Sequence, residues 1–283
     1  PLDDGQTIRH RVCSANSYLC PIMASDTIWQ RWRQRLFSSS APHPVDEESG
    51  CFWQVDIHSH LLPGVDDGVA DWAQALACLQ QLADWGIRKV VTTPHVSRDW
   101  YPNKPADLRR GQRTLQALAE EHQLPLTVEV AAEYMLDDFF SEILESGEAL
   151  TFGEPKYLLV ETGWASAPLG LENLLFRVQT QGYTPLLAHP ERYRYYHDDE
   201  AGLARLREMG CLFQLNWMSL TGRYGRSVRR QAGLMLQRGW VDFLGSDLHR
   251  PTDLDDLAAL FTSQEYRLLR DQPLRNHTLL GRN

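Results

Sequence analysis

Short apolar, β-prone runs alternate with helical patterns from residue 52 to the end of the chain. Parallel strands need long crossover connections, so β runs that are each followed by a helix predict a parallel sheet. The sheet could be a closed α/β barrel or an open doubly wound sheet, and the spacing of the runs separates the two only weakly. The predicted strands are residues 52–57, 89–93, 126–131, 156–160, 184–188, 211–215 and 241–244.

The segments between these runs have apolar residues at helical spacing. In the first of them, Trp72, Leu76 and Leu79 would share one face, and Gly86 provides a C-terminal stop. The predicted helices are residues 71–85, 105–122, 138–144, 171–181, 200–208, 228–238 and 254–269.

A side chain that can bind a metal follows each predicted strand. His58 and His60 follow the first run and would point to the same side of a strand, because side chains alternate along it. The later runs are followed by His95, Glu133, Glu161, His189, Asn216, Asp247 and His249. An open sheet would spread these strand ends along a line, whereas a closed barrel gathers them at one mouth. The polar residues therefore favour the barrel.

Composition limits the classes of function. The chain has 283 residues, 43% of them hydrophobic, which is enough for one sizeable core. A net charge of -9 argues against nucleic acid as the partner. The five cysteines form no CxxC pair, so we expect no disulfide framework and a cytoplasmic protein. The sequence contains no apolar run long enough to cross a membrane.

The first 50 residues have no sustained periodicity and are predicted to be a poorly ordered extension. Met23 precedes a plausible start, so residues 1–22 are expected to be added or upstream sequence. Residues 27–37 could form a short amphipathic helix that packs on its own domain. The remaining residues, 51–283, are predicted to be the functional domain.

The candidate ligands are too numerous for a single ion, so we expect a cluster of cations. Imidazoles and carboxylates without thiolates suit Mn, Fe or Zn. A carboxylate such as Glu133 or Glu161 could bridge two ions, an arrangement that suits phosphoester hydrolysis. A cysteine nucleophile is excluded, because no cysteine has an arginine six positions later, as cysteine-dependent tyrosine phosphatases require.

These motifs resemble a known family. VDIHSHLLPGVDDG, TTPH, AAEY, LLVET, LLAHPERY, FQLNWMSLTGRYG and DFLGSDLH are similar to the PHP (polymerase and histidinol phosphatase) domain. More narrowly, they resemble the manganese-dependent bacterial protein-tyrosine phosphatases of capsule and exopolysaccharide synthesis, over about residues 50–260. The resemblance implies a distorted seven-stranded (β/α)7 TIM-like barrel, the PHP fold, with three Mn²⁺ ions. It also implies that a metal-bridging hydroxide hydrolyses phosphotyrosine on a protein. The expected protein substrate is an autophosphorylating tyrosine kinase.

The resemblance also implies the ligands of each ion. The first ion would be held by His58, His60, Glu133 and Asp247. The second would be held by Glu133, Glu161 and His189, and the third by Asp67, His95 and His249. Asp66 is the less expected of the two adjacent aspartates, because the family ligand directly precedes the glycine.

Two arginines are candidate catalytic residues. Arg192 matches a family arginine that contacts phosphate; the alternative for it is a surface ion pair with Glu191 or another acid. Arg250 could give a second phosphate contact, although relatives often have another residue here and, in one branch, an arginine slightly further along. The segment after Glu161, Thr-Gly-Trp-Ala, is also less apolar than the family pattern.

Other functions remain open at this point. The main alternative is a small-molecule phosphatase of the same fold, acting on histidinol phosphate or a sugar phosphate. A polymerase-associated nuclease fits the acidic chain less well, and a metal-binding regulatory module without turnover is a further alternative. Aromatic and polar loop residues could form a mouth for a phosphotyrosine ring, namely Tyr101, Asn103, Tyr193, Tyr195 and Tyr196.

Overall fold

Every predicted strand occurs in the computed structural model, which describes residues 50–197 and 199–281. The described residues all belong to one compact unit, Glu47–Asn283. The strands are β1 (Val55–Asp56), β2 (Lys89–Thr92), β3 (His95–Val96), β4 (Thr127–Val130), β5 (Glu133–Met135), β6 (Tyr157–Glu161), β7 (Thr184–Ala188), β8 (Leu212–Asn216) and β9 (Phe243–Gly245). The extension predicted over residues 1–50 and the helix predicted over residues 27–37 lie outside the described residues, which begin at Gly50.

The strands pair in parallel throughout the described part of the chain. One sheet has the order β1-β2-β4 and the other has the order β3-β5-β6-β7-β8-β9. Two breaks separate them: Thr93-Pro94 lies between β2 and β3, and Ala131-Ala132 lies between β4 and β5. The second and third predicted strands correspond to β2 and β4, whereas β3 and β5, which follow the two breaks, were not predicted. They continue the parallel arrangement from one sheet into the next. The result is a curled parallel sheet.

The first and last strand segments also lie side by side. Ser59 and Leu248 form an isolated parallel bridge. The N–H of Asp247 donates to the carbonyl of His58 at 2.7 Å, and the N–H of His60 donates to the carbonyl of Leu248 at 2.9 Å. These contacts bring the candidate ligands that follow β1 and β9 to one place.

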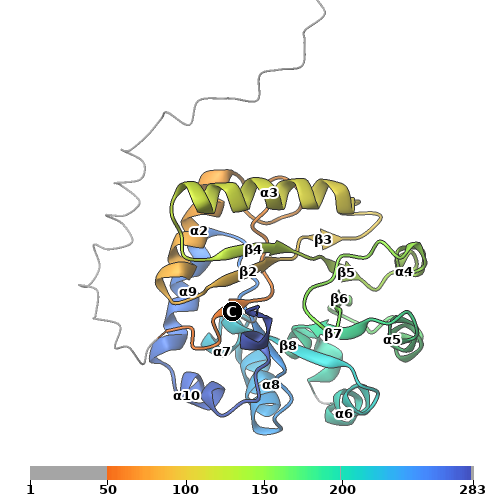
Figure 1. Cartoon of the computed structure of the whole chain (residues 1–283). Helices are drawn as coiled ribbons and strands as arrows, with labels where there is room; N and C mark the ends of the chain where they lie inside the picture. The colour runs from red at the N-terminus through yellow and green to blue at the C-terminus, as the bar shows by residue number, and fades with distance from the viewer. Residues whose placement is uncertain (1–49, 198, 282–283) are drawn as a thin grey trace, which may run out of the picture. The chain divides into compact units, whose positions relative to one another are not determined.

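Helices lie around the curled sheet, with α3 on one side and α6 and α8 on the other (Figure 1). They are α2 (Trp72–Asp84), α3 (Pro105–Glu121), α4 (Phe140–Ser146), α5 (Leu171–Thr180), α6 (Glu200–Glu208), α7 (Trp217–Thr221), α8 (Arg226–Gln237), α9 (Leu254–Ala258) and α10 (Gln264–Arg270). Short 3-10 turns are η1 (Pro190–Arg192), η2 (Arg194–Tyr196), η3 (Pro251–Asp253), η4 (Ala259–Thr262) and η5 (Asn276–Leu279).

Two helical features differ from the prediction. The single helix predicted over 254–269 is divided into α9, η4 and α10, because Ser263 is extended and its side chain accepts the N–H of Tyr266. Asn216 likewise caps α7, a short helix that was not predicted, by accepting the N–H of Met218 at 2.9 Å. Side-chain caps of this kind start a new helix at their own position.

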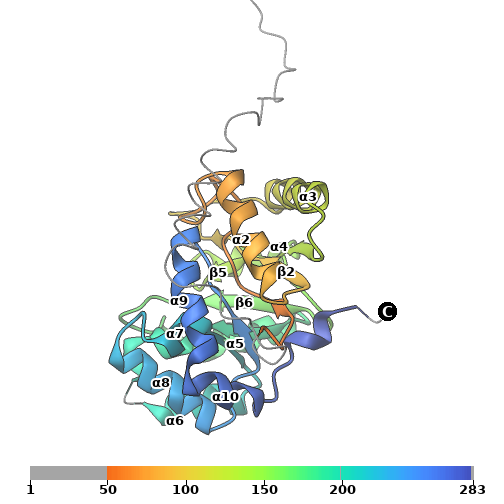
Figure 2. The same ribbon diagram turned by 90° about the vertical axis from the view of Figure 1, so that its left-hand side faces the viewer.

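The sheet is apolar on both faces. Leu158 and Val160 of β6 belong to the large core between strands and helices, whereas Tyr157 and Leu159 belong to a smaller core on the opposite face. Because side chains alternate along a strand, Glu161 shares the face of Tyr157 and Leu159. Figure 2 shows the strands enclosed by helices from a second direction. The smaller core therefore lies on the same face of β6 as the Glu161 carboxylate.

Candidate metal centre

Glu133 is fully buried and lies at the centre of the candidate ligands. Its Oε2 atom lies 3.2 Å from Nε2 of His58, 3.4 Å from Nε2 of His60 and 3.1 Å from Nδ1 of His95. Its Oε1 atom lies 2.8 Å from Nε2 of His189. Three chain segments thus present four imidazoles to the two oxygens of one carboxylate, which is the arrangement a bridging ligand needs.

The spacing around His58 and His60 fits one cation. Their Nε2 atoms lie 3.2 Å apart, and each lies 3.4 Å from Oδ1 of Asp247. Together with Oε2 of Glu133, the two imidazoles form a compact group of possible ligands. Ligand atoms about 2.0–2.2 Å from one ion, at angles of about 100–110°, lie roughly 3.2–3.5 Å from each other. The side chains present therefore fit a metal ion at this point.

Two further groups adjoin the first. His95, Glu133 and Glu161 form one of them, with Nδ1 of His95 2.9 Å from Oε1 of Glu161. The other contains Asp67, His95 and His249 together with His60, and Oδ1 of Asp67 lies 3.6 Å from Nε2 of both His95 and His249.

The structure thus brings together the residues that the resemblance assigns to the first and third ions. The residues assigned to the second ion, Glu133, Glu161 and His189, do not form one compact group. His189 meets the Oε1 side of Glu133, whereas the imidazole beside Glu161 belongs to His95.

Charge in the cluster is mutually compensated. Burial alone would lower the pKa of His58, but the carboxylates of Glu133 and Asp247 outweigh it and raise that pKa. For His95, burial likewise disfavours the protonated form, but Glu133 favours it and raises the pKa of His95 to about 9. His189 behaves differently, because burial and the charge of Arg192 lower its pKa to about 4. Cations that bind here would therefore replace protons on some of the histidines.

Asp66 and Gln214 hydrogen-bond to the Nδ1 atoms of His60 and His58 and so orient these two imidazoles. Nδ1 of His60 lies 2.7 Å from Oδ2 of Asp66, and Nδ1 of His58 lies 2.9 Å from Oε1 of Gln214. When Nδ1 donates in these hydrogen bonds, Nε2 is left as the atom that can bind a cation. Asp66, which was not predicted to bind a metal, is thus the hydrogen-bond partner of the predicted ligand His60.

Two glycines allow this close packing. A Cβ atom on Gly245 would lie 2.6 Å from Cβ of His58 and 2.9 Å from Nε2 of Gln214. A Cβ atom on Gly68 would lie 2.3 Å from the carbonyl oxygen of His60. With contacts this short, a larger residue at either position would force neighbouring atoms to shift. Gln214 was missed from the sequence, although its one visible signal is a polar residue inside the buried run Cys-Leu-Phe-Gln-Leu.

The backbone is unusual at two candidate ligands. His189 has φ of 34° and Asp247 has φ of 52°, in the left-handed region that residues other than glycine rarely adopt. Each residue comes directly after, or two residues after, the end of its strand, β7 or β9. Strain of this kind is concentrated at functional sites, where it aims a side chain away from the alternation of the strand.

Arg192 pairs with Asp247 and not with Glu191. Its Nη1 atom donates to Oδ2 of Asp247 at 2.6 Å, and Nδ2 of Asn216 donates to the same oxygen at 2.7 Å. The guanidinium carbon lies 4.2 Å from the ring centroids of both Trp164 and Tyr224. The arginine is thus fixed beside the cluster through aromatic contacts and one ion pair.

The second candidate arginine is placed differently. Arg250 is exposed, and none of the ion pairs in the described part of the chain involves its guanidinium group. Its backbone N–H donates to Asp253 at 3.1 Å. A phosphate contact from Arg250 therefore stays a prediction.

The proposed aromatic mouth is only partly formed by the expected residues. Tyr101 stacks on His95, with ring centroids 5.4 Å apart. Tyr193 and Tyr196 are buried, and Tyr195 is hydrogen-bonded to Thr162. Asn103 holds the backbone instead, donating from Nδ2 to the carbonyls of Val65 and His95.

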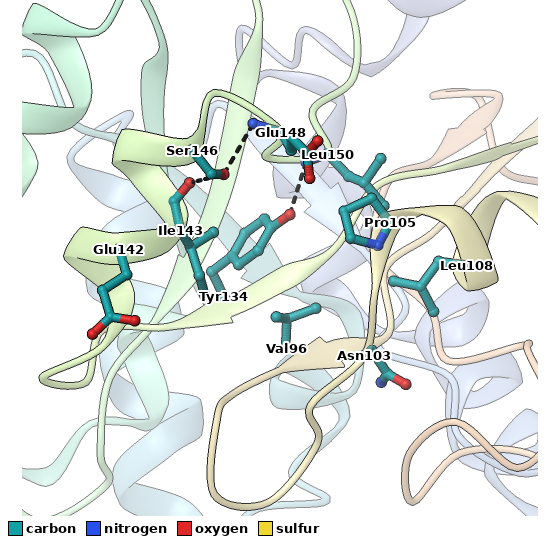
Figure 3. A pocket seen from close by; sticks show the side chains of 10 residues that line it. All are labelled: Val96, Asn103, Pro105, Leu108, Tyr134, Glu142, Ile143, Ser146, Glu148 and Leu150. Carbon is teal, nitrogen blue, oxygen red and sulfur yellow. Dashed lines mark hydrogen bonds between the residues drawn. The ribbon is translucent and has the colours of Figure 1, made fainter.

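A cavity of about 250 Å³ lies beside the metal centre and is lined by other side chains. Val96 and Tyr134, the neighbours of His95 and Glu133 along β3 and β5, form part of its wall (Figure 3). The hydroxyl of Tyr134 accepts the N–H of Leu150 at 2.7 Å. None of the nine predicted metal ligands lines this cavity.

Thiol chemistry is disfavoured in the described part of the chain. Cys51, Cys78 and Cys211 are free and buried. Burial raises the pKa of each thiol, to about 12 for Cys211. A thiol that keeps its proton is a poor nucleophile.

Comparison with known proteins places the chain. A family model described as capsular polysaccharide synthesis, CpsB/CapC, matches residues 54–255. The chain belongs to the CpsB/CapC family. This finding confirms the family resemblance inferred from the sequence motifs.

Relatives in the CpsB/CapC family are named tyrosine phosphatases. The chain is 30% identical over 195 residues to tyrosine-protein phosphatase YwqE of Bacillus subtilis (strain 168), covering 69% of this chain and 77% of YwqE. It is 31% identical over 199 residues to putative tyrosine-protein phosphatase CapC of Staphylococcus aureus, covering 70% and 78%. It is 29% identical over 206 residues to CpsB of Streptococcus pneumoniae, covering 69% and 82%.

The fold of the CpsB/CapC family is also matched. A chain from the crystal structures of YwqE from Bacillus subtilis and CpsB from Streptococcus pneumoniae superposes with a TM-score of 0.65 and 27% identity, covering 78% of this chain and 96% of that chain. Those proteins are described as unique metal-dependent tyrosine phosphatases. None of the helices in the described part of this chain is long and apolar enough to cross a membrane.

Proposed function

We propose that this protein is a metal-dependent phosphatase that hydrolyses phosphotyrosine on proteins. The observation that carries the proposal is the buried Glu133 carboxylate, whose two oxygens face four imidazoles. Imidazoles and a carboxylate that converge in this way form a set of ligands suited to divalent transition metals. The metal dependence and the tyrosine phosphatase names of the relatives support the same reaction.

The ligand sets follow the family pattern. Three cations, Mn²⁺ in the first instance and Fe or Zn as alternatives, would be held by these ligand sets, and Glu133 belongs to the sets of the first two. The proposed ligands are His58, His60, Glu133 and Asp247 for the first ion, Glu133, Glu161 and His189 for the second, and Asp67, His95 and His249 for the third. Asp66 and Gln214 would orient His60 and His58 in this arrangement.

Bound cations would supply an activated water as nucleophile and would neutralise charge on the phosphoryl oxygens. The chain itself provides Arg192. Nη1 of Arg192 is taken by Asp247, and its other guanidinium N–H groups make no hydrogen bond in the described residues, so they can donate to a phosphoryl oxygen. A tyrosine leaving group, with a reference pKa of about 10, needs less protonation than an alkyl alcohol, which favours aryl phosphates.

The curled sheet supports a finer description of the fold. We propose that residues 51–283 form a distorted (β/α)7 barrel of the PHP type. The parallel bridge between Ser59 and Leu248, with its two flanking backbone hydrogen bonds, supports closure between the first and last strand segments. Closure matters for the chemistry, because it would let His58 and Asp247 bind the same ion.

The partner and the compartment are also proposals. An autophosphorylating tyrosine kinase that controls capsule or exopolysaccharide synthesis would present the phosphotyrosine in the cytoplasm. The family description as capsular polysaccharide synthesis supports this partner. Free buried cysteines support a reducing compartment.

A direct comparison of substrates tests the proposal. The metal-depleted protein is loaded with Mn²⁺ and assayed with a phosphotyrosine peptide and with histidinol phosphate. We expect faster turnover of the peptide, loss of turnover with a chelator, and loss in His189→Ala but not in His122→Ala, an exposed histidine at the end of α3. Faster turnover of histidinol phosphate would assign the site to small molecules. Full activity after metal depletion would overturn the mechanism.

A further inference from the structure

Trp164 lies against two groups of the candidate active site. Its ring stacks on the imidazole of His189, with centroids 5.3 Å apart and planes inclined by 22°. The guanidinium carbon of Arg192 lies 4.2 Å from the Trp164 ring. The N–H of Arg194 donates to the carbonyl of Trp164 at 3.3 Å, which fixes the backbone of this loop. The indole is therefore held in place before any substrate arrives.

A large part of the indole is nevertheless open to solvent. Trp164 is 43% exposed, whereas His189 beneath it is 2% exposed. Large apolar side chains that are both exposed and held in one orientation are typical of binding surfaces. The open part of the ring thus forms a rim beside His189 and Arg192.

The position of this rim decides what it would meet. A phosphoryl group bound by the cluster and by the free N–H groups of Arg192 would lie next to the side chains that Trp164 covers. In an in-line attack from the cluster the ester oxygen lies opposite the nucleophile, on the open side of the site, where Trp164 is exposed. The organic part of the substrate therefore comes close to the indole.

We propose that Trp164 is a specificity-determining residue that selects aryl over alkyl phosphate monoesters by stacking on the ring of the leaving group. This inference rests on the proposed phosphatase function and adds a residue that the family pattern does not provide. Aromatic pairs with centroids about 4.5–7 Å apart give an advantage that corresponds to roughly 2- to 10-fold in affinity. An alkyl leaving group such as that of phosphoserine gains no such contact.

Tyr101 is the rival for this role. It stacks on His95 at 5.4 Å and 16°, much as Trp164 stacks on His189. However, the rings that contact Arg192 are those of Trp164 and Tyr224. Since the arginine marks the side on which the phosphoryl group binds, the geometry favours Trp164 over Tyr101.

The test compares variants Trp164→Ala, Trp164→Phe and Tyr101→Ala with Phe176→Ala, which removes an exposed ring from α5. Each Mn²⁺-loaded protein is assayed with two peptides of one sequence, carrying phosphotyrosine or phosphoserine. Binding of the non-hydrolysable phenylphosphonate and methylphosphonate is measured by calorimetry. We expect Trp164→Ala to raise KM for the phosphotyrosine peptide and the Kd of phenylphosphonate by about 2- to 10-fold. The phosphoserine and methylphosphonate values should change less than these, because only the aryl ligands lose a stacking partner in addition to any shift of Arg192.

The remaining variants distinguish specificity from a structural effect. Trp164→Phe should restore most of the preference for phenylphosphonate, and Phe176→Ala should match the wild type. An equal loss for both phosphonates in Trp164→Ala, or loss of the preference in Tyr101→Ala instead, would overturn the assignment. A wild type that turns over neither peptide would overturn the proposed function, while the two phosphonate affinities would still decide the role of Trp164.

Discussion

The carboxylate of Asp66 joins His60 to the backbone of His95. Its Oδ2 atom lies 2.7 Å from Nδ1 of His60 and accepts the N–H of His95 at 3.1 Å, while Oδ1 accepts the N–H of Gly68. One side chain therefore sets the position of two candidate ligands that lie 35 residues apart in the sequence. The adjacent aspartate, Asp67, turns toward His95 and His249 instead.

Asp66→Asn should weaken metal binding without unfolding the protein. The amide keeps the size of the carboxylate but loses its charge, so His60 is oriented less firmly. Loss of a partner behind a metal ligand typically costs 10- to 100-fold in metal affinity, and we expect about this loss for Mn²⁺ by calorimetry. Asp99→Asn, an exposed aspartate in the loop after β3, is the control and should bind like the wild type. Equal affinities for the two variants would contradict the orienting role.

Gly245→Ala should displace His58 or Gln214 and so weaken both the fold and metal binding. The added methyl group would meet Cβ of His58 at 2.6 Å and Nε2 of Gln214 at 2.9 Å, so one of them must shift. We expect a loss of about 1–3 kcal/mol in the free energy of unfolding, together with weaker metal binding. Urea denaturation and calorimetry measure the two effects.

Gly233→Ala is the matched control for that change. Gly233 lies inside α8, and an added Cβ would meet no atom within 4 Å. Alanine in a helix interior is favoured over glycine, so this variant should gain roughly 0.5–1 kcal/mol in stability and bind metal normally. If both variants lost stability alike, the close contact at Gly245 would not be the cause.

The sequence was sufficient for seven of the strands in the described residues and for the polar residues that follow them. Glu161 could be predicted because alternation within one strand places it on the face of Leu159, two residues earlier. Gln214 and Trp164 could not, because their roles depend on contacts with His58 and His189, which come from other strands or loops. The short strands β3 and β5 were missed for a related reason: each follows a break in the chain and pairs in a different sheet from the strand before it.

Arg192 shows the same limit for a candidate catalytic residue. Its family motif indicated a phosphate contact, and a surface ion pair with Glu191 or another acid was the alternative. In the structure Glu191 is occupied by the N–H of Asn216 and the hydroxyl of Ser219. The ion-pair partner is Asp247, 55 residues away, which no local pattern could indicate.

Metal loading should release protons near neutral pH. His95 has a pKa of about 9 in the protein without cations, because Glu133 and Glu161 outweigh the opposite effect of its burial, and it must lose its proton to bind a cation. Mn²⁺ titrations at pH 7 in buffers of different ionisation enthalpy should show release of about one proton or more. The variant His95→Gln should release fewer protons. Binding without any release at pH 7 would show that the histidines are already neutral.

Asp56 should make stability depend on pH. It is buried and accepts hydrogen bonds from the N–H and hydroxyl of Ser246, yet burial outweighs them and raises its pKa from 3.8 to about 6. The folded protein therefore holds this proton more tightly than the unfolded chain. The stabilising contribution is complete below about pH 4 and is lost as the pH rises through about 6.

Asp56→Asn removes this titration, so the comparison isolates it. Under chelating conditions, the free energy of unfolding of the wild type relative to Asp56→Asn should fall by about 2 kcal/mol between pH 4 and pH 7. Urea denaturation at several pH values measures the difference, and Asp99→Asn, with an exposed carboxylate, should show no comparable slope. Because every other group is shared, a difference between wild type and Asp56→Asn that stays constant over this range would mean that Asp56 is ionised in the fold at little cost. Ser246 would then have to stabilise the charged form more strongly than burial opposes it.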